Sequence, residues 1–153
     1  PVVDSDEGSS FSGRRMTLSA QQVENEGGAR PTRSGPIRVL IIDDDWDTLE
    51  MLSHTLRKRG MDVMTAKDGL KGIEESRRAR FDVAIVDLGL PHLHGHRLGE
   101  TLRTNGDRPR LIALTGDGRA EARAESERIG FDAHFVKPAP MTELIDLIER
   151  LAL

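Results

Sequence analysis

Acidic side chains, one hydroxyl and one lysine follow short apolar runs at four separate places in this chain. The runs cover residues 39–42, 83–86, 111–114 and 133–136, and they lead into Asp43-Asp44-Asp45, Asp87, Thr115-Gly116 and Lys137-Pro138. Short runs rich in Val and Ile, separated by polar segments of helical length, are typical of strands in a buried parallel sheet. Such sheets bind ligands beyond the carboxyl ends of their strands. We therefore expect these side chains to meet at one edge of a sheet.

This set of side chains suits the binding of a cation and of a phosphoryl group. Two carboxylates about 4 Å apart repel by about 4 kcal/mol at an effective dielectric of about 20, so Asp43, Asp44 and Asp87 together need a proton or a cation. Their hard oxygen ligands favour Mg²⁺. Lys137 can pair with a carboxylate at rest and with a phosphoryl oxygen later, and Thr115 can donate its hydroxyl to that oxygen. One of the three consecutive aspartates is also expected to cap the first helix, because Asp is a favoured N-cap.

Strand-like and helix-like segments alternate five times from Ile37 onward, which predicts an α/β fold with a doubly wound, five-stranded parallel sheet and helices on both faces. Four helices are marked by apolar residues at helical spacing: Leu49, Leu52 and Leu56; Leu70 and Ile73; Leu98 and Leu102; and Leu144, Ile145, Ile148 and Leu151. A further helix, over about residues 119–129, has a thin apolar stripe. We expect it to dock weakly, which suits a movable element.

The composition excludes several classes of protein. The chain of 153 residues has no cysteine, which rules out disulfides, thiolate catalysis and Cys-based zinc sites. A net charge of −4 without a basic stripe gives no sign of direct nucleic-acid binding. No apolar stretch approaches the length of a membrane span, and no signal-like segment opens the chain, so we expect a cytoplasmic protein. Residues 1–36 read as a flexible tail and linker, and residues 37–153 as the folded domain.

The region from about Ile37 to Leu153 resembles the receiver domain of a two-component response regulator. The resemblance rests on Ile41-Ile42-Asp43-Asp44-Asp45, on Val86-Asp87-Leu88-Gly89-Leu90-Pro91 with Gly95, on Leu114-Thr115-Gly116, and on Phe135-Val136-Lys137-Pro138. It implies a flavodoxin-like strand order of 2-1-3-4-5. It also implies that a histidine kinase or phosphotransfer domain passes a phosphoryl group to this chain, which then changes conformation. The chain itself is not expected to be a stand-alone enzyme, and its downstream target stays unknown.

The resemblance also assigns roles to individual residues. It implies that Asp87 is the phospho-acceptor, that Asp44 and Asp87 bind Mg²⁺ directly, and that Asp43 acts through water. The backbone carbonyl of Gly89 is implied as a further metal ligand. Thr115 and Lys137 are implied as the pair that senses the phosphoryl group.

Histidines stand at two places where the family usually has other residues. The family's switch aromatic, three residues before the lysine, falls on His134. The imidazole can rotate and stack like a small ring, but it adds pH dependence. His92, His94 and His96 alternate in one loop, where they could form a transition-metal site or simply a solvated loop.

The tail carries a second, shorter resemblance. Gly8-Ser9-Ser10-Phe11 followed by Met16-Thr17-Leu18 is similar to the last strand of a histidine-kinase ATP-binding domain, although Gly13-Arg14-Arg15 interrupts the alternation. A kinase domain, a linker and a receiver form the layout of a hybrid sensor histidine kinase. The same residues could equally be an unstructured extension.

Three alternative functions use similar residues. A haloacid-dehalogenase-like phosphatase would also use an aspartate nucleophile and Mg²⁺, but it needs an acidic pair after its lysine, where only Glu143, Asp146 and Glu149 stand at helical spacing. A flavodoxin-like FMN carrier fails because it needs a Ser/Thr/Gly phosphate loop after the first strand, where Asp43-Asp44-Asp45 would repel a phosphate without bridging cations. A receiver that is not phosphorylated and serves only for docking is disfavoured by the intact acidic, hydroxyl and lysine set.

Overall fold

The computed structural model describes residues 35–90, 95–104, 108–116 and 118–153. The chain divides into two units, Pro1–Arg33 and Ser34–Leu153, and the fold described below is that of the second. The kinase-like motif of the tail lies outside the described residues, as do His92 and His94 and the side chain of His96.

The second unit is a five-stranded parallel sheet with a helix after each strand. In chain order the elements are β1 (Arg38–Ile42), α1 (Trp46–Lys58), β2 (Asp62–Ala66), α2 (Gly69–Arg78), β3 (Val83–Asp87), α3 (Gly95–Thr104), β4 (Arg110–Thr115), α4 (Ala120–Ile129), β5 (Ala133–Val136) and α5 (Met141–Leu151). The strand order is β2-β1-β3-β4-β5 and every pairing is parallel. This confirms the predicted doubly wound fold and its order. Among the described helices, none combines the length and the apolar character that a membrane span requires.

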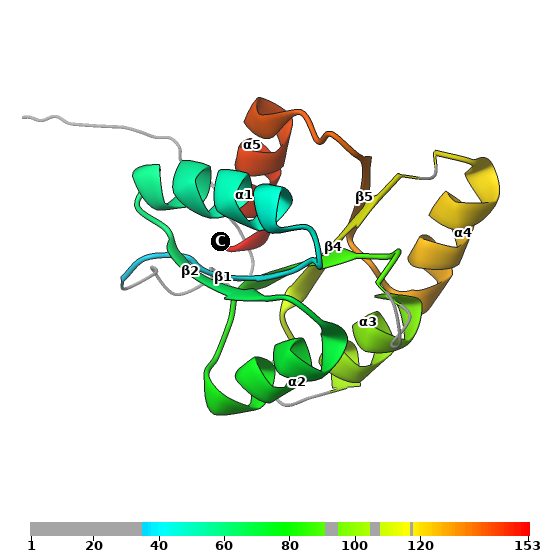
Figure 1. Ribbon diagram of the computed structural model, residues 1–153, viewed down its shortest axis with the longest axis horizontal. Coiled ribbons are helices and arrows are strands. Elements are labelled where there is room, and N and C mark those ends of the chain that lie inside the picture. The colour runs from blue at the N-terminus through cyan, green and yellow to red at the C-terminus, as the bar shows by residue number, and fades with distance from the viewer. Residues whose placement is uncertain (1–34, 91–94, 105–107, 117) are drawn as a thin grey trace, which may run out of the picture. The chain divides into compact units, whose positions relative to one another are not determined.

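Two apolar layers hold the sheet between its helices. One layer joins α1 and α5 to one face of the sheet, and the other joins α3 and the end of α4 to the opposite face. Figure 1 shows α1 and α5 on one side of the strands, with α2, α3 and α4 on the other. All five residues of β3 are buried, which matches the continuous apolar run that a strand covered on both faces requires. The central strands are therefore the most firmly fixed part of the domain.

Of the two apolar residues that marked helix α2 in the sequence, Ile73 packs against the core and Leu70 does not. Leu70 is 74% exposed, whereas Gly69, Gly72 and Glu75 are buried. A Cβ atom on Gly72 would lie 2.4 Å from Cδ1 of Ile42, so any larger residue here would require the Ile42 side chain or the helix to shift. The helix that Leu70 and Ile73 marked is therefore present, with its glycines rather than Leu70 facing the sheet.

Helix α4 has the thin apolar stripe that its sequence predicted. Its buried residues are Ser126 and Ile129, whereas α5 buries Leu144, Ile145 and Ile148. Burial of a large aliphatic side chain stabilises a fold by about 1.5–3 kcal/mol, so α4 gains less from packing than α5 does. The position of α4 consequently depends on few contacts.

Candidate functional site

The register of the sheet brings the predicted site residues to one edge. Ile42 pairs with Val86, so Asp43 follows β1 beside Asp87 at the end of β3. Asp87 in turn pairs with Leu114, the residue before Thr115. Lys137 follows β5 and donates its backbone N–H to the carbonyl oxygen of Thr115 at 2.7 Å. The expectation that these four strand ends share an edge is confirmed.

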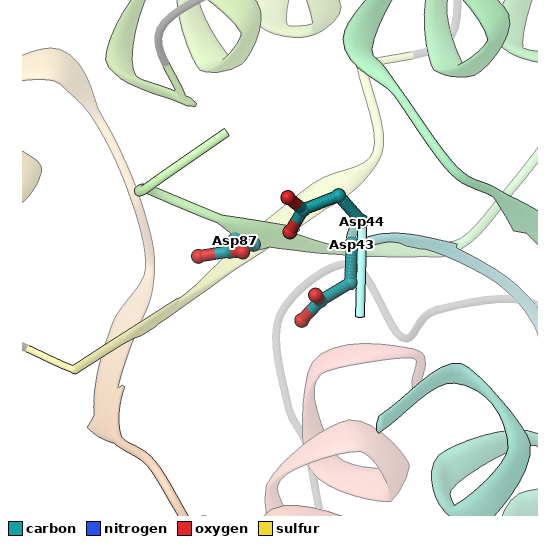
Figure 2. Close-up of side chains that lie close together, drawn as sticks. All are labelled: Asp43, Asp44 and Asp87. Atoms are coloured by element: carbon teal, nitrogen blue, oxygen red, sulfur yellow. The ribbon is translucent and has the colours of Figure 1, made fainter. Parts of the chain in front are cut away.

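Three carboxylates form a compact cluster at this edge. One oxygen each from Asp43, Asp44 and Asp87 lies within 4.8 Å of the others. Figure 2 shows the side chains of Asp43 and Asp44, from the end of β1, close to that of Asp87 from β3. Asp43 is fully buried and Asp87 is 6% exposed, whereas Asp44 is exposed. The cluster thus has a buried base and a rim that solvent reaches.

Two backbone amides hold the carboxylates of Asp43 and Asp87 in place. The N–H of Asp45 donates to Oδ1 of Asp43 at 2.9 Å, and the N–H of Gly89 donates to Oδ1 of Asp87, also at 2.9 Å. Each bond spans two residues, as in an Asx-turn, and is a local interaction of the loop that follows the strand. Each carboxylate therefore has one oxygen bound by its own loop.

Lys137 lies against the other oxygens of the same two carboxylates. Its Nζ is 2.8 Å from Oδ2 of Asp43 and 3.4 Å from Oδ2 of Asp87. The approach to Asp43 Oδ2 does not have hydrogen-bond angles, but the short distance between opposite charges makes it an ion pair. One ammonium group therefore partly compensates two carboxylates, as the sequence predicted for the resting state.

Burial and charge shift the pKa values of this pair in ways that follow from the geometry. Burial, helped by the negative charge of Asp87, raises the pKa of Asp43, although Lys137 and the Asp45 amide act against the shift. For Lys137, burial alone would lower the pKa, but the ion pair with Asp43 and the charge of Asp87 outweigh it, so the pKa of Lys137 is raised. The site holds more negative charge than one lysine compensates, which favours an added cation.

The remaining predicted residues lie around this cluster. Thr115 ends β4 and is 6% exposed. The backbone N–H of Gly89 donates to Asp87, and the role of the Gly89 carbonyl as a metal ligand stays a prediction. His134 is half-buried on β5, where it pairs with Ala113 and is separated from Lys137 by two residues. Its Nδ1 lies 3.1 Å from Oγ of Ser126 on α4.

Two features of the site were not identified from the sequence. Asp45 occupies the N-cap position of α1, as expected for one of the three aspartates, but the bond that its carboxylate accepts from the Thr48 hydroxyl at 2.6 Å, which lowers the pKa of Asp45, was not identified. Ser126 was not singled out, because nothing in its local sequence indicates which residue of β5 it faces. Only the rotation of α4 about its axis determines that contact.

The acidic residues after Lys137 do not form a second acidic site. Glu143 and Asp146 are exposed on α5, and Glu149 pairs with Arg59 at a distance of 3.1 Å. The acidic pair that a haloacid-dehalogenase-like phosphatase requires is therefore missing from the described residues near the cluster.

Comparison with known proteins agrees with this geometry. Residues 39–149 match the response regulator receiver domain. The probable transcriptional regulatory protein SilR of Salmonella typhimurium is 33% identical over 115 residues, which are 75% of this chain and 50% of SilR. The probable transcriptional regulatory protein TcrX of Mycobacterium tuberculosis is 33% identical over 110 residues, which are 72% of this chain and 47% of TcrX. The chain spans about half the length of the curated relatives that it matches.

Solved structures show the same architecture. The chemotaxis protein CheY4 of Vibrio cholerae superposes with a TM-score of 0.73 at 29% identity, over 76% of this chain and 99% of CheY4. The receiver domain of the sensor histidine kinase PA1611 of Pseudomonas aeruginosa, which has a magnesium ion coordinated in its active-site cleft, gives a TM-score of 0.69 at 26% identity, over 77% of this chain and 98% of that domain. By sequence and by fold, the chain belongs to the response regulator receiver domain family.

Proposed function

We propose that Asp87 accepts a phosphoryl group from a phosphohistidine of a partner histidine kinase or phosphotransfer domain. The observation that carries this proposal is the position of Lys137, whose Nζ lies within 3.4 Å of both Asp43 and Asp87 at the carboxyl edge of the sheet. An ammonium group in this position can transfer its ion pair from a carboxylate to a phosphoryl oxygen. Family membership supports the same reaction.

The acidic cluster fits a Mg²⁺ ion. Its three carboxylates supply hard oxygen ligands within 4.8 Å of one another, and burial, with a smaller contribution from the charge of Asp87, raises the pKa of Asp43, so a cation beside this carboxylate would stabilise its charged form. Asp43, Asp44 and Asp87 would hold the ion, with the Gly89 carbonyl as a further ligand. When bound, Mg²⁺ supplies positive charge that stabilises the transferring phosphoryl group. The magnesium ion in the related receiver of PA1611 supports this assignment.

The chain's own residues position and stabilise the group that is transferred. A carboxylate oxygen of Asp87 forms the new bond to phosphorus as the bond from phosphorus to the donor imidazole nitrogen breaks, and that nitrogen keeps the electron pair. The Gly89 amide holds Asp87 in orientation through Oδ1. Lys137 and the Thr115 hydroxyl then bind phosphoryl oxygens, so that catalysis is mainly positioning and electrostatics.

The phosphoryl group acts on the rest of the domain through its charge. It adds about −1.5 to −2 charges to Asp87 and draws Thr115 and Lys137 towards it. Thr115 leads directly into the connection to α4, and His134 lies on β5 two residues before the Val136 partner of Thr115. We assign the change of conformation to α4 and His134. A hybrid-kinase parent protein and a cytoplasmic location remain predictions.

Labelling of Asp87 tests the proposal. Purified protein is incubated with acetyl phosphate and Mg²⁺, and intact mass and peptide mass spectrometry locate the added phosphoryl group. Asp87→Asn should abolish labelling without unfolding the domain, because the change is nearly isosteric. Asp62→Asn is the matched control. Asp62 is exposed at the start of β2, where it pairs with Arg38 at the start of β1, and the acidic cluster lies at the other edge of the sheet. Full labelling of Asp87→Asn at another residue would refute the assignment.

A further inference from the structure

Helix α4 is connected to the sheet by a polar contact next to the site. Nδ1 of His134 on β5 lies 3.1 Å from Oγ of Ser126, and Ser126 is fully buried. A recess of about 230 Å³ between α4 and β5 is lined by both residues. The contact therefore joins the strand that precedes Lys137 to the helix that follows Thr115.

The hydroxyl of Ser126 determines which way the hydrogen bond runs. Oγ of Ser126 lies 3.0 Å from the carbonyl oxygen of Ala122, one turn earlier in α4, and donates its single proton there. The oxygen can then only accept a hydrogen bond from the ring, so Nδ1 of His134 carries a proton. This tautomer is imposed by the contact with α4.

The contact between Ser126 and His134 is a large part of what holds α4 against the sheet, because α4 buries few residues. Ser126 is one of the two residues that α4 buries, and Ile129 is the other. Residues 116–119 connect Thr115 to α4, whereas His134 is held in the sheet through its pairing with Ala113. The backbone of Thr115 is paired with Val136 of β5, so β4 and β5 stay together while movement of the Thr115 side chain towards Asp87 changes the connection that leads to α4. The hydrogen bond between α4 and β5 resists that change.

We infer that Ser126 is a positioning residue that holds His134 and α4 in the resting arrangement, and that this hydrogen bond breaks when the domain is phosphorylated. The inference rests on the proposed function and deepens it by naming the contact that restrains the switch. Ser126 touches neither the phosphoryl group nor the metal ligands. It acts through His134 and through the helix that carries it.

Nuclear magnetic resonance of the imidazole nitrogens tests the resting arrangement directly. At about pH 8, where histidine side chains are generally neutral, His134 should carry its proton on Nδ1. Ser126→Ala should remove this preference, and saturation with Mg²⁺ and beryllofluoride, a phosphoryl mimic, should remove it in the unaltered protein. Ser76→Ala is the matched control, because Ser76 is another helical serine whose hydroxyl donates to a backbone carbonyl, that of Ile73. That control should leave the His134 signals unchanged.

Affinity for beryllofluoride tests the proposed restraint. Ser126→Ala removes one hydrogen bond from the resting state, so the change to the switched state no longer has to break that bond. Beryllofluoride should therefore bind Ser126→Ala about fivefold more tightly than the unaltered protein. His134→Phe should tighten binding similarly, and adding Ser126→Ala to it should change nothing further. The inference would be overturned, with the proposed function left standing, if His134 carried its proton on Nε2 at rest. Equal affinities of the unaltered protein and Ser126→Ala for beryllofluoride would overturn it in the same way. Failure of the unaltered protein to bind beryllofluoride would reject the proposed function, and this role of Ser126 with it.

Discussion

Replacement of Lys137 by methionine should destabilise the metal-free domain far more than loss of a surface ion pair does. Lys137 Nζ lies 2.8 Å from a fully buried carboxylate, Asp43, and 3.4 Å from Asp87. At an effective dielectric of about 20, these attractions amount to about 6 and about 5 kcal/mol before desolvation is subtracted. Removing one partner of a buried pair typically costs about 3–5 kcal/mol, because the other charge stays buried.

Protonation of Asp43 limits this loss. The ordinary pKa of an aspartate is 3.8, so Asp43 is ionised in the unfolded chain at pH 7. Folding with Asp43 protonated instead then costs about 4 kcal/mol, which sets an upper limit on the penalty of burying its charge. We therefore expect Lys137→Met to lower the free energy of unfolding by about 3–4 kcal/mol and the melting temperature by about 12 °C. Arg59→Met is the control, since Arg59 pairs with Glu149 at 3.1 Å but both side chains are at least 40% exposed. It should cost less than about 1 kcal/mol.

Urea denaturation followed by circular dichroism measures these differences with and without Mg²⁺ and across pH. Mg²⁺ should restore much of the stability of Lys137→Met, because a bound cation compensates Asp43 and Asp87. Lower pH should do the same: burial raises the folded-state pKa of Asp43, so the penalty is present above that pKa and disappears as the pH falls towards 3.8. The reasoning is refuted if Lys137→Met loses no more than Arg59→Met, or if neither Mg²⁺ nor acid reduces the loss.

Three further predictions concern other parts of the chain. The fluorescence of Trp46, which is 61% exposed and begins α1 two residues after Asp44, should change saturably with Mg²⁺ and again with beryllofluoride, and Asp44→Ala should abolish both changes. Gly95→Ala should cost at least about 2 kcal/mol in urea denaturation and weaken Mg²⁺ binding in calorimetry, because its Cβ would lie 2.4 Å from Cα of Leu88 and 2.6 Å from the carbonyl oxygen of Asp87. Deletion of residues 1–35 should leave the melting temperature and the Mg²⁺ affinity nearly unchanged, since these residues lack apolar periodicity, and a fall of many degrees would contradict that view.

The sheet and the position of the site could be predicted from the sequence because both depend on local patterns. An apolar run such as Val83–Val86 is long enough for a buried strand, and the polar residue that follows it, Asp87, must lie at the carboxyl edge. Parallel pairing then brings Asp87 beside Asp43 whatever the helices do. The chemistry of the edge thus follows from the order of residues along the chain.

Contacts that depend on the rotation of a helix could not be predicted in the same way. Leu70 and Ile73 marked α2 in the sequence, but only Ile73 packs against the core, and the closest approach of the helix to β1 is made by Gly72 beside Ile42. The bond between Ser126 and His134 joins residues on two elements whose relative rotation depends on packing throughout the layer. Apolar spacing identifies a helix, but a helix with few apolar residues leaves its rotation open.

The two backbone N–H groups that donate to Oδ1 of Asp43 and to Oδ1 of Asp87 affect the thermodynamics of cation binding. Both carboxylates already have their orientation fixed by backbone amides of their own loops, so an entering ion orders few side-chain torsions. The site should behave as a rigid chelator, in which the heat and entropy of binding come mainly from water released by the ion. Calorimetry of the domain with Mg²⁺ should accordingly show a heat-capacity change close to zero, because almost no apolar surface is buried when the ion enters.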